Sequence, residues 1–103
     1  MNKVIRDGKV GVVYSPGFGA GWSTWNRSQA EFLLFDAEII RLIESNRHDE
    51  IEPYLNGLFN DDGYYSTEKL AIAWLPSGTK FRIDEYDGSE SVIYLSAEEY
   101  FTA

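Results

Sequence analysis

Two Asp-Gly dipeptides, one near each end of the chain, constrain the fold more than any other feature. Asp7-Gly8 and Asp87-Gly88 both lie between runs rich in β-branched and aromatic residues. Asp-Gly readily adopts the positive φ angles of a two-residue hairpin turn, so each pair predicts a tight turn between antiparallel strands. The first turn leads into a predicted strand over 9–15. The second joins predicted strands over 80–86 and 91–95.

Between these hairpins the hydrophobic pattern changes. The apolar residues that follow Asp36 lie on one face of a helix, which predicts a helix from Ala37 to about Ser45 with Asp36 as its N-cap. The short apolar run 32–35 before it is predicted to be a buried strand or extended segment. Later in the chain, large and small residues alternate over 70–75, which predicts a further strand.

A second helix is predicted to begin after Asp49, because Asp49 and Glu52 have the spacing of a capping box. The residues expected on its buried side are Ile51, Tyr54, Leu55 and Leu58. Near the end of the chain, Ser96 with Glu99 could cap a final helical turn.

Together these elements predict an α+β fold: an N-terminal β-hairpin, two central helices and a C-terminal antiparallel β-meander, forming a mainly antiparallel sheet with helices on one face. Hydrophobic residues make up 44% of the 103 residues, enough for one core, so we expect 1–103 to be a single compact domain. No apolar run approaches the roughly 20 residues that cross a bilayer. No signal region is visible and cysteine is absent, which together favour a cytoplasmic location.

The net charge of −8 is unevenly distributed. Residues 1–30 hold four basic side chains against one acidic, a net charge of +3, whereas 31–103 hold five basic against sixteen acidic, a net charge of −11. A surplus of acid argues against direct binding to a nucleic-acid backbone. The acidic part could imitate nucleic acid on a partner's surface, or it could simply keep the protein soluble.

The segment 15–26 is the most distinctive candidate site. Alternate glycines let the backbone approach a ligand and can turn successive N–H groups toward an anion, while aromatic rings could stack on a base. The spacing is neither that of a dinucleotide fingerprint nor that of a P-loop. The alternative is a wide turn whose tryptophans close the core. The candidate ligand- or partner-binding residues are Gly17, Gly19, Gly21, Trp22, Ser23, Thr24 and Trp25.

Catalytic and metal chemistry find little support in the residues. His48 is the only histidine and is expected to be an exposed residue at a helix junction. The acidic groups at 61–62 and 84–90 lack the spacing of a calcium loop, so we predict no metal site, no cofactor and no catalytic residues.

Three segments resemble parts of small uncharacterised acidic proteins encoded by phages and prophages. They are the first turn and strand over 7–10, the Gly/Trp segment over 15–25, and the stretch 74–90 around the second turn. The resemblance implies a bacterial cytoplasm during infection as the setting, where such proteins act by binding host factors. It carries no catalytic residues over to this chain.

These observations favour a non-enzymatic binding protein of the phage or prophage accessory type, for example an inhibitor of a host or defence protein. A first alternative is a protein that binds or sequesters a small anionic, nucleotide-like ligand in the Gly/Trp loop. That alternative requires Lys3, Arg6, Lys9 or Arg27 to approach the loop, and a homo-oligomer would help to build a pocket deep enough. A second alternative is an acidic mimic of nucleic acid. No membrane partner is expected.

Overall fold

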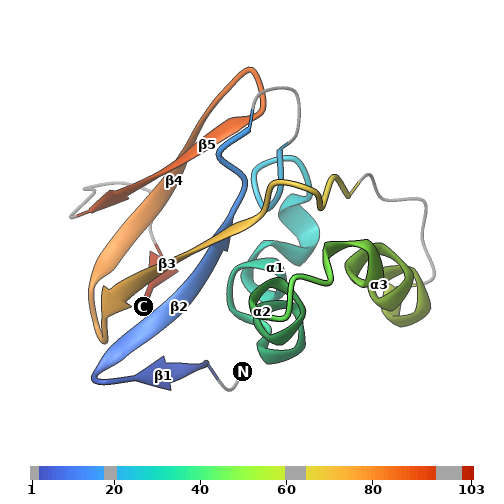
Figure 1. Ribbon diagram of the computed structural model, residues 1–103. Coiled ribbons are helices and arrows are strands. Elements are labelled where there is room, and N and C mark those ends of the chain that lie inside the picture. Colours follow the sequence, from blue (N-terminus) through green and yellow to red (C-terminus); the bar gives the residue numbers. More distant parts are fainter. Residues whose placement is uncertain (1–2, 18–20, 60–64, 95–100) are drawn as a thin grey trace.

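The computed structural model describes residues 3–17, 21–59, 65–94 and 101–103, and it has the α+β class that the sequence predicts (Figure 1). Its helical segments lie together in the middle of the chain. They are the 3-10 turn Arg27–Gln29, α1 (Ala30–Phe35), α2 (Ala37–Glu44), the 3-10 turn His48–Glu50 and α3 (Ile51–Phe59). The strands are β1 (Ile5–Arg6), β2 (Lys9–Tyr14), β3 (Ala71–Pro76), β4 (Lys80–Tyr86), β5 (Ser89–Tyr94) and β6 (Phe101–Thr102). No described helix is long and apolar enough to span a membrane.

The antiparallel strands divide into two three-stranded sheets, ordered β1-β2-β3 and β5-β4-β6. Strand β3 pairs with β2 over six residue positions and so belongs to the first sheet, while β4 pairs with β5 and β6 in the second. Two backbone contacts connect the sheets at opposite ends. The Glu90 amide donates to Ser15 O at 2.7 Å, and the Gly78 amide donates to Ala103 O at 2.7 Å.

Both Asp-Gly turns are confirmed. Asp7 and Gly8 have φ angles of 52° and 75°, and Asp87 and Gly88 have 51° and 84°. Each two-residue turn joins its strands directly: Arg6 on β1 pairs with Lys9 on β2, and Tyr86 on β4 pairs with Ser89 on β5. A two-residue hairpin turn of this kind needs a positive φ at both central residues, and aspartate and glycine adopt that conformation with little strain.

The predicted cap at Asp36 is also confirmed, but the segment before it is different. The Asp36 carboxylate accepts from the Ile39 amide at 3.1 Å and so caps α2. Residues 32–35, predicted as extended, belong to α1, because the extended backbone of Asp36 (ψ 128°) separates two short helices. The side chains of Leu33, Leu34 and Phe35 are buried as predicted, but by a helix.

Two predictions about the second helix are wrong. Asp49 lies inside the 3-10 turn that precedes α3, so it does not form the predicted capping box. Leu58 is 51% exposed, whereas Ile51 and Leu55 are fully buried, so the apolar stripe of α3 is narrower than its sequence indicates. The helical turn predicted from Ser96 and Glu99 falls outside the described residues.

Strand β2 lies between two hydrophobic cores because its side chains alternate between its faces. Val13 packs into a core formed with α2, α3 and Trp22, while Val10 and Val12 pack into a second core with Phe35 on α1 and Phe81 on β4. Figure 1 shows the two sheets together on one side of the molecule and α2 and α3 on the other. This arrangement brings α1 and the 3-10 turn before it close to the second sheet.

Candidate functional site

The Gly/Trp segment is part of the core at Trp22. The side chain of Trp22 is fully buried, and its indole N–H donates to Leu33 O at 2.8 Å. Its ring meets that of Tyr65 edge to face, with centroids 6.2 Å apart. A ring held in this way cannot stack on a ligand, so here the packing alternative for Trp22 is confirmed.

The backbone of the same segment converges on an anion, and that anion is the chain's own Glu90. The Glu90 side chain is only 2% exposed. One carboxylate oxygen accepts from the Ser15 amide at 3.0 Å, and the other accepts from the Trp22 amide at 2.8 Å. The second oxygen also accepts from the amide and the hydroxyl of Thr24, at 3.1 and 2.6 Å. These four hydrogen bonds compensate the carboxylate for lost water and tie the loop to β5.

The sequence-based predictions include Glu90 only as a member of the acidic group 84–90, and they do not include this role. The alternation along β5 contains a usable signal, because Val92 faces the core and Glu90, two residues earlier, shares its face. A carboxylate at an inward position needs hydrogen-bond donors.

The other candidate residues have separate environments. A Cβ on Gly21 would lie 2.3 Å from the Trp25 ring, so glycine lets that ring pack against the backbone, and Trp25 remains 45% exposed. Gly17 lies against Lys69, 2.5 Å from where its Cβ would be. Gly19 lies outside the described residues. Gly17 and Gly21, the two described glycines, therefore contact different side chains and do not line one ligand site.

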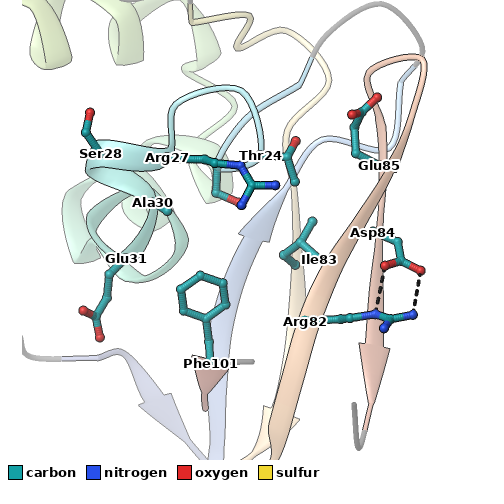
Figure 2. A pocket seen from close by; sticks show the side chains of 11 residues that line it. Thr24, Arg27, Ser28, Ala30, Glu31, Arg82, Ile83, Asp84, Glu85 and Phe101 are labelled. Atoms are coloured by element: carbon teal, nitrogen blue, oxygen red, sulfur yellow. Dashed lines mark hydrogen bonds and ion pairs between the residues drawn. The ribbon is translucent and has the colours of Figure 1, made fainter. Parts of the chain in front are cut away.

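Ser23 and Thr24 do contribute to a cleft, which has a volume of about 750 Å³ (Figure 2). One wall comes from the end of the Gly/Trp segment and the start of α1: Ser23, Thr24, Arg27, Ser28, Ala30 and Glu31. The other comes from the second sheet: Arg82, Ile83, Asp84 and Glu85 of β4, with Phe101 of β6. The cleft is thus built from parts of the chain more than fifty residues apart.

The charges in this cleft are mixed. Arg82 forms an ion pair with Asp84 at 2.9 Å, and Glu85 accepts from the Gly88 amide at 2.8 Å. Arg27 has no hydrogen bond or ion pair from its side chain to any part of the chain that the structure describes. Figure 2 shows its guanidinium reaching from the helical wall toward Thr24 and Ile83. Arg27 is therefore the cation that the cleft presents to a ligand.

The other three basic residues expected near the loop lie elsewhere. Lys3 donates to Thr102 O at 2.6 Å and lies over the Phe35 ring. Arg6 is bonded to Glu44 and stacks over Trp74, beside a smaller pocket of about 350 Å³ that Lys9 also lines. Of the four, Arg27 alone lines the cleft beside Ser23 and Thr24.

The last two features to consider are the single histidine and the possibility of a metal site. His48 lies at the helix junction as predicted but is half-buried instead of exposed, because a nitrogen of its ring lies 3.2 Å from Leu70 O and connects the helices to the start of β3. Within the described ranges, no three His, Cys, Asp or Glu side chains gather closely enough to hold a metal ion.

Comparison with protein-family models, curated proteins and solved structures found no significant match to this chain.

Proposed function

We propose that this chain is a non-enzymatic binding protein that engages a partner protein through the cleft between the 23–31 segment and β4. The observation that carries the proposal is the construction of the cleft. Its two walls are held together by the buried Glu90, and Arg27, which forms no ion pair with the described residues, lines it. Concave surfaces that combine apolar and convergent polar groups are typical binding sites, and this cleft brings Ile83 and Phe101 together with Arg27 and the Thr24 hydroxyl.

The partner that we favour is a host or defence protein in the bacterial cytoplasm, with the chain acting as an accessory protein or inhibitor. The sequence resemblance to phage and prophage proteins supports this setting. The acidic surface supports it too, because a high net charge steers association with a complementary partner and excludes others.

Site-specific photocrosslinking in a bacterial host tests the proposal. A photoreactive benzoylphenylalanine replaces Ser28, which is exposed and lines the cleft. The matched control replaces Glu52, which is exposed on α3, away from the cleft. We expect position 28 to form an adduct with one defined host protein and position 52 to form none. Equal labelling at both positions, or none at either, contradicts the proposal.

A small anionic ligand is the second candidate, and one observation favours it. Arg27 and the hydroxyl-bearing Ser23 and Thr24 border the same cleft, as the sequence-based ligand hypothesis requires. The ligand would lie in the cleft and not on the loop amides, because the amides of Trp22 and Thr24 already donate to Glu90. Native mass spectrometry of gently purified protein distinguishes the two candidates. A retained mass of a few hundred daltons supports the small ligand, and a retained protein supports the first proposal.

A further inference from the structure

The two Asp-Gly turns share a backbone conformation but have different surroundings. Asp7 and Asp87 have φ angles of 52° and 51°, and Gly8 and Gly88 have 75° and 84°. Each turn joins two antiparallel strands directly. A difference in their chemistry, beyond that caused by flanking residues, therefore reflects what each turn contacts.

The contacts of the two glycine amides differ. The Gly88 amide donates to Oε2 of Glu85 at 2.8 Å, and Gly88 is buried. Gly8 is exposed, and a Cβ added to it would have nothing within 4 Å. No hydrogen bond joins the Gly8 N–H to another residue in the part of the chain that the structure describes. The Gly8 carbonyl is anchored, because it accepts from the Ser77 amide at 2.9 Å.

An aspartate that precedes glycine can react with the backbone that follows it. The glycine nitrogen attacks Cγ of the aspartate, a C–N bond forms, and the carboxyl OH leaves as water with the amide proton. The product is a five-membered succinimide ring. Water then opens the ring at either carbonyl and yields aspartate or isoaspartate, whose main chain runs through Cβ. The reaction needs no cofactor, but the glycine nitrogen must be free to approach the carboxyl carbon, and the missing Cβ leaves room for it.

We propose that Asp7-Gly8 is a site of spontaneous isoaspartate formation, independent of the binding proposed above, and that Glu85 protects Asp87-Gly88 from the same reaction. The Gly88 nitrogen can attack only after it gives up its hydrogen bond to Glu85 and leaves its buried position. Hydrogen bonds to a charged acceptor are among the strongest in proteins, so this local opening slows the reaction at Asp87 at least about tenfold.

Two further pairs carry the same types of residue. Asn56-Gly57 lies inside α3, where backbone amides belong to the helical hydrogen-bond ladder and ring closure requires the helix to open. Asp62-Gly63 lies outside the described residues. Among the described pairs, Asp7-Gly8 is therefore the one whose amide is accessible.

Conversion of Asp7 would change the hairpin that contains it. Isoaspartate adds one carbon to the main chain of the turn, so Arg6 and Lys9 would no longer be joined by a two-residue turn. Arg6 is bonded to Glu44 on α2 and lies over the ring of Trp74. We expect the modification to loosen the attachment of β1 to the rest of the molecule.

Incubation of the full chain in water labelled with heavy oxygen tests the proposal. Each passage through the ring adds one heavy oxygen atom, and mass spectrometry of proteolytic fragments locates it. Synthetic peptides that cover 3–12 and 83–92 give the rate of each sequence without the fold. We expect the rate at Asp7, divided by the rate in its peptide, to exceed the same ratio at Asp87 at least about tenfold. Equal ratios, or a larger ratio at Asp87, overturn the proposal.

A matched pair of variants tests the role of Glu85. Glu85→Ala removes the acceptor of the Gly88 amide, whereas Glu85→Gln keeps an oxygen there and removes only the charge. We expect labelling at Asp87 to rise about tenfold in Glu85→Ala and less than about threefold in Glu85→Gln. Asn56 is the internal control, because global unfolding would raise its labelling too. Unchanged or slower labelling at Asp87 in Glu85→Ala overturns the protective role.

Amide exchange of Gly11 measures the effect on β1, because the Gly11 amide donates to Val4 O at 3.0 Å. We expect this amide to exchange faster in aged protein, in proportion to the isoaspartate found at position 7. Exchange that stays constant while isoaspartate accumulates would show that β1 keeps its place, and it would overturn the expected loosening.

Discussion

The Oε2 atom of Glu90 accepts two hydrogen bonds from Thr24, one from the hydroxyl at 2.6 Å and one from the amide at 3.1 Å. Glu90 lies on β5 and Thr24 lies on the opposite wall of the cleft, sixty-six residues earlier. The pair therefore fixes the distance between the helical wall and the β4-β5 hairpin. The cleft is preformed by this contact, so a ligand does not have to order the loop.

Replacing Glu90 should destabilise the protein and open the cleft. In Glu90→Ala four donors lose their acceptor, and we expect unfolding to become easier by about 2–4 kcal/mol. In Glu90→Gln the amide oxygen can keep the donors on Oε2 and lose only the Ser15 amide, so the cost should be about 1–2 kcal/mol. Urea unfolding measures both.

Acetate gives an independent check of the Glu90 cavity. The carboxylate of added acetate can occupy the site left by Glu90→Ala and bind only the folded state, so it should raise the stability of that variant relative to chloride. Glu52→Ala on α3 is the control, with an expected change within about 0.5 kcal/mol and no acetate effect. A Glu90→Ala variant as stable as the wild-type protein contradicts the anchoring role.

The two tryptophans of the Gly/Trp segment should respond differently to truncation. Trp22 is fully buried, so Trp22→Ala should cost about 3–5 kcal/mol of unfolding free energy. Trp25 is 45% exposed, and Trp25→Ala should cost about 1 kcal/mol or less. Thermal or urea unfolding of both variants checks the difference. Similar losses at the two positions would contradict the assignment of Trp22 alone to the core.

Tyr54 should make the stability of the protein decrease at alkaline pH. Burial raises the pKa of the Tyr54 phenol, and the hydrogen bond that it donates to Asp36 at 2.9 Å raises it further. The unfolded chain loses this proton near pH 10, while the folded chain retains it. The stabilisation is therefore complete below about pH 10 and is lost as the pH rises toward the folded value.

Tyr54→Phe should remove this contribution to the pH dependence. Urea unfolding of both proteins at pH 9 and pH 11 measures it, with the wild-type protein losing more stability over that interval than the variant. The other tyrosines are common to both proteins and cancel in the comparison. Equal losses would show that the Tyr54 phenol is not held protonated by burial and Asp36.

Local sequence chemistry predicts much of the fold. Asp7-Gly8 and Asp87-Gly88 specify turns through the φ angles of two residues, and Asp36 specifies a helix start through one hydrogen bond to Ile39. The run 32–35 was mistaken for an extended segment, because four consecutive apolar residues fit a buried strand and a buried helix equally. Leu58 was wrongly predicted to be buried, because the apolar stripe of α3 continues beyond Leu55, the last of its residues that is fully buried.

The candidate site is predicted less well, because it depends on contacts between distant segments. Ser23 and Thr24, predicted as binding residues on the basis of their hydrogen-bond capacity, line the cleft. The amides of their segment do converge on an anion, but Glu90 supplies that anion from 66 residues away. The pairing of Glu90 with the loop does not follow from local patterns, since it depends on how two sheets and a loop pack.

The most direct test of how the binding site is held together is amide hydrogen exchange, measured residue by residue with NMR on the free protein. Amides held in buried hydrogen bonds exchange slowly, while amides exposed to water exchange fast. We predict slow exchange for the amides of Trp22 and Thr24, which donate to the buried Glu90 carboxylate, and exchange at least about tenfold faster for both amides in Glu90→Ala. Equally slow exchange of Trp22 and Thr24 in the wild-type protein and in Glu90→Ala would show that Glu90 does not hold the loop and would contradict the account.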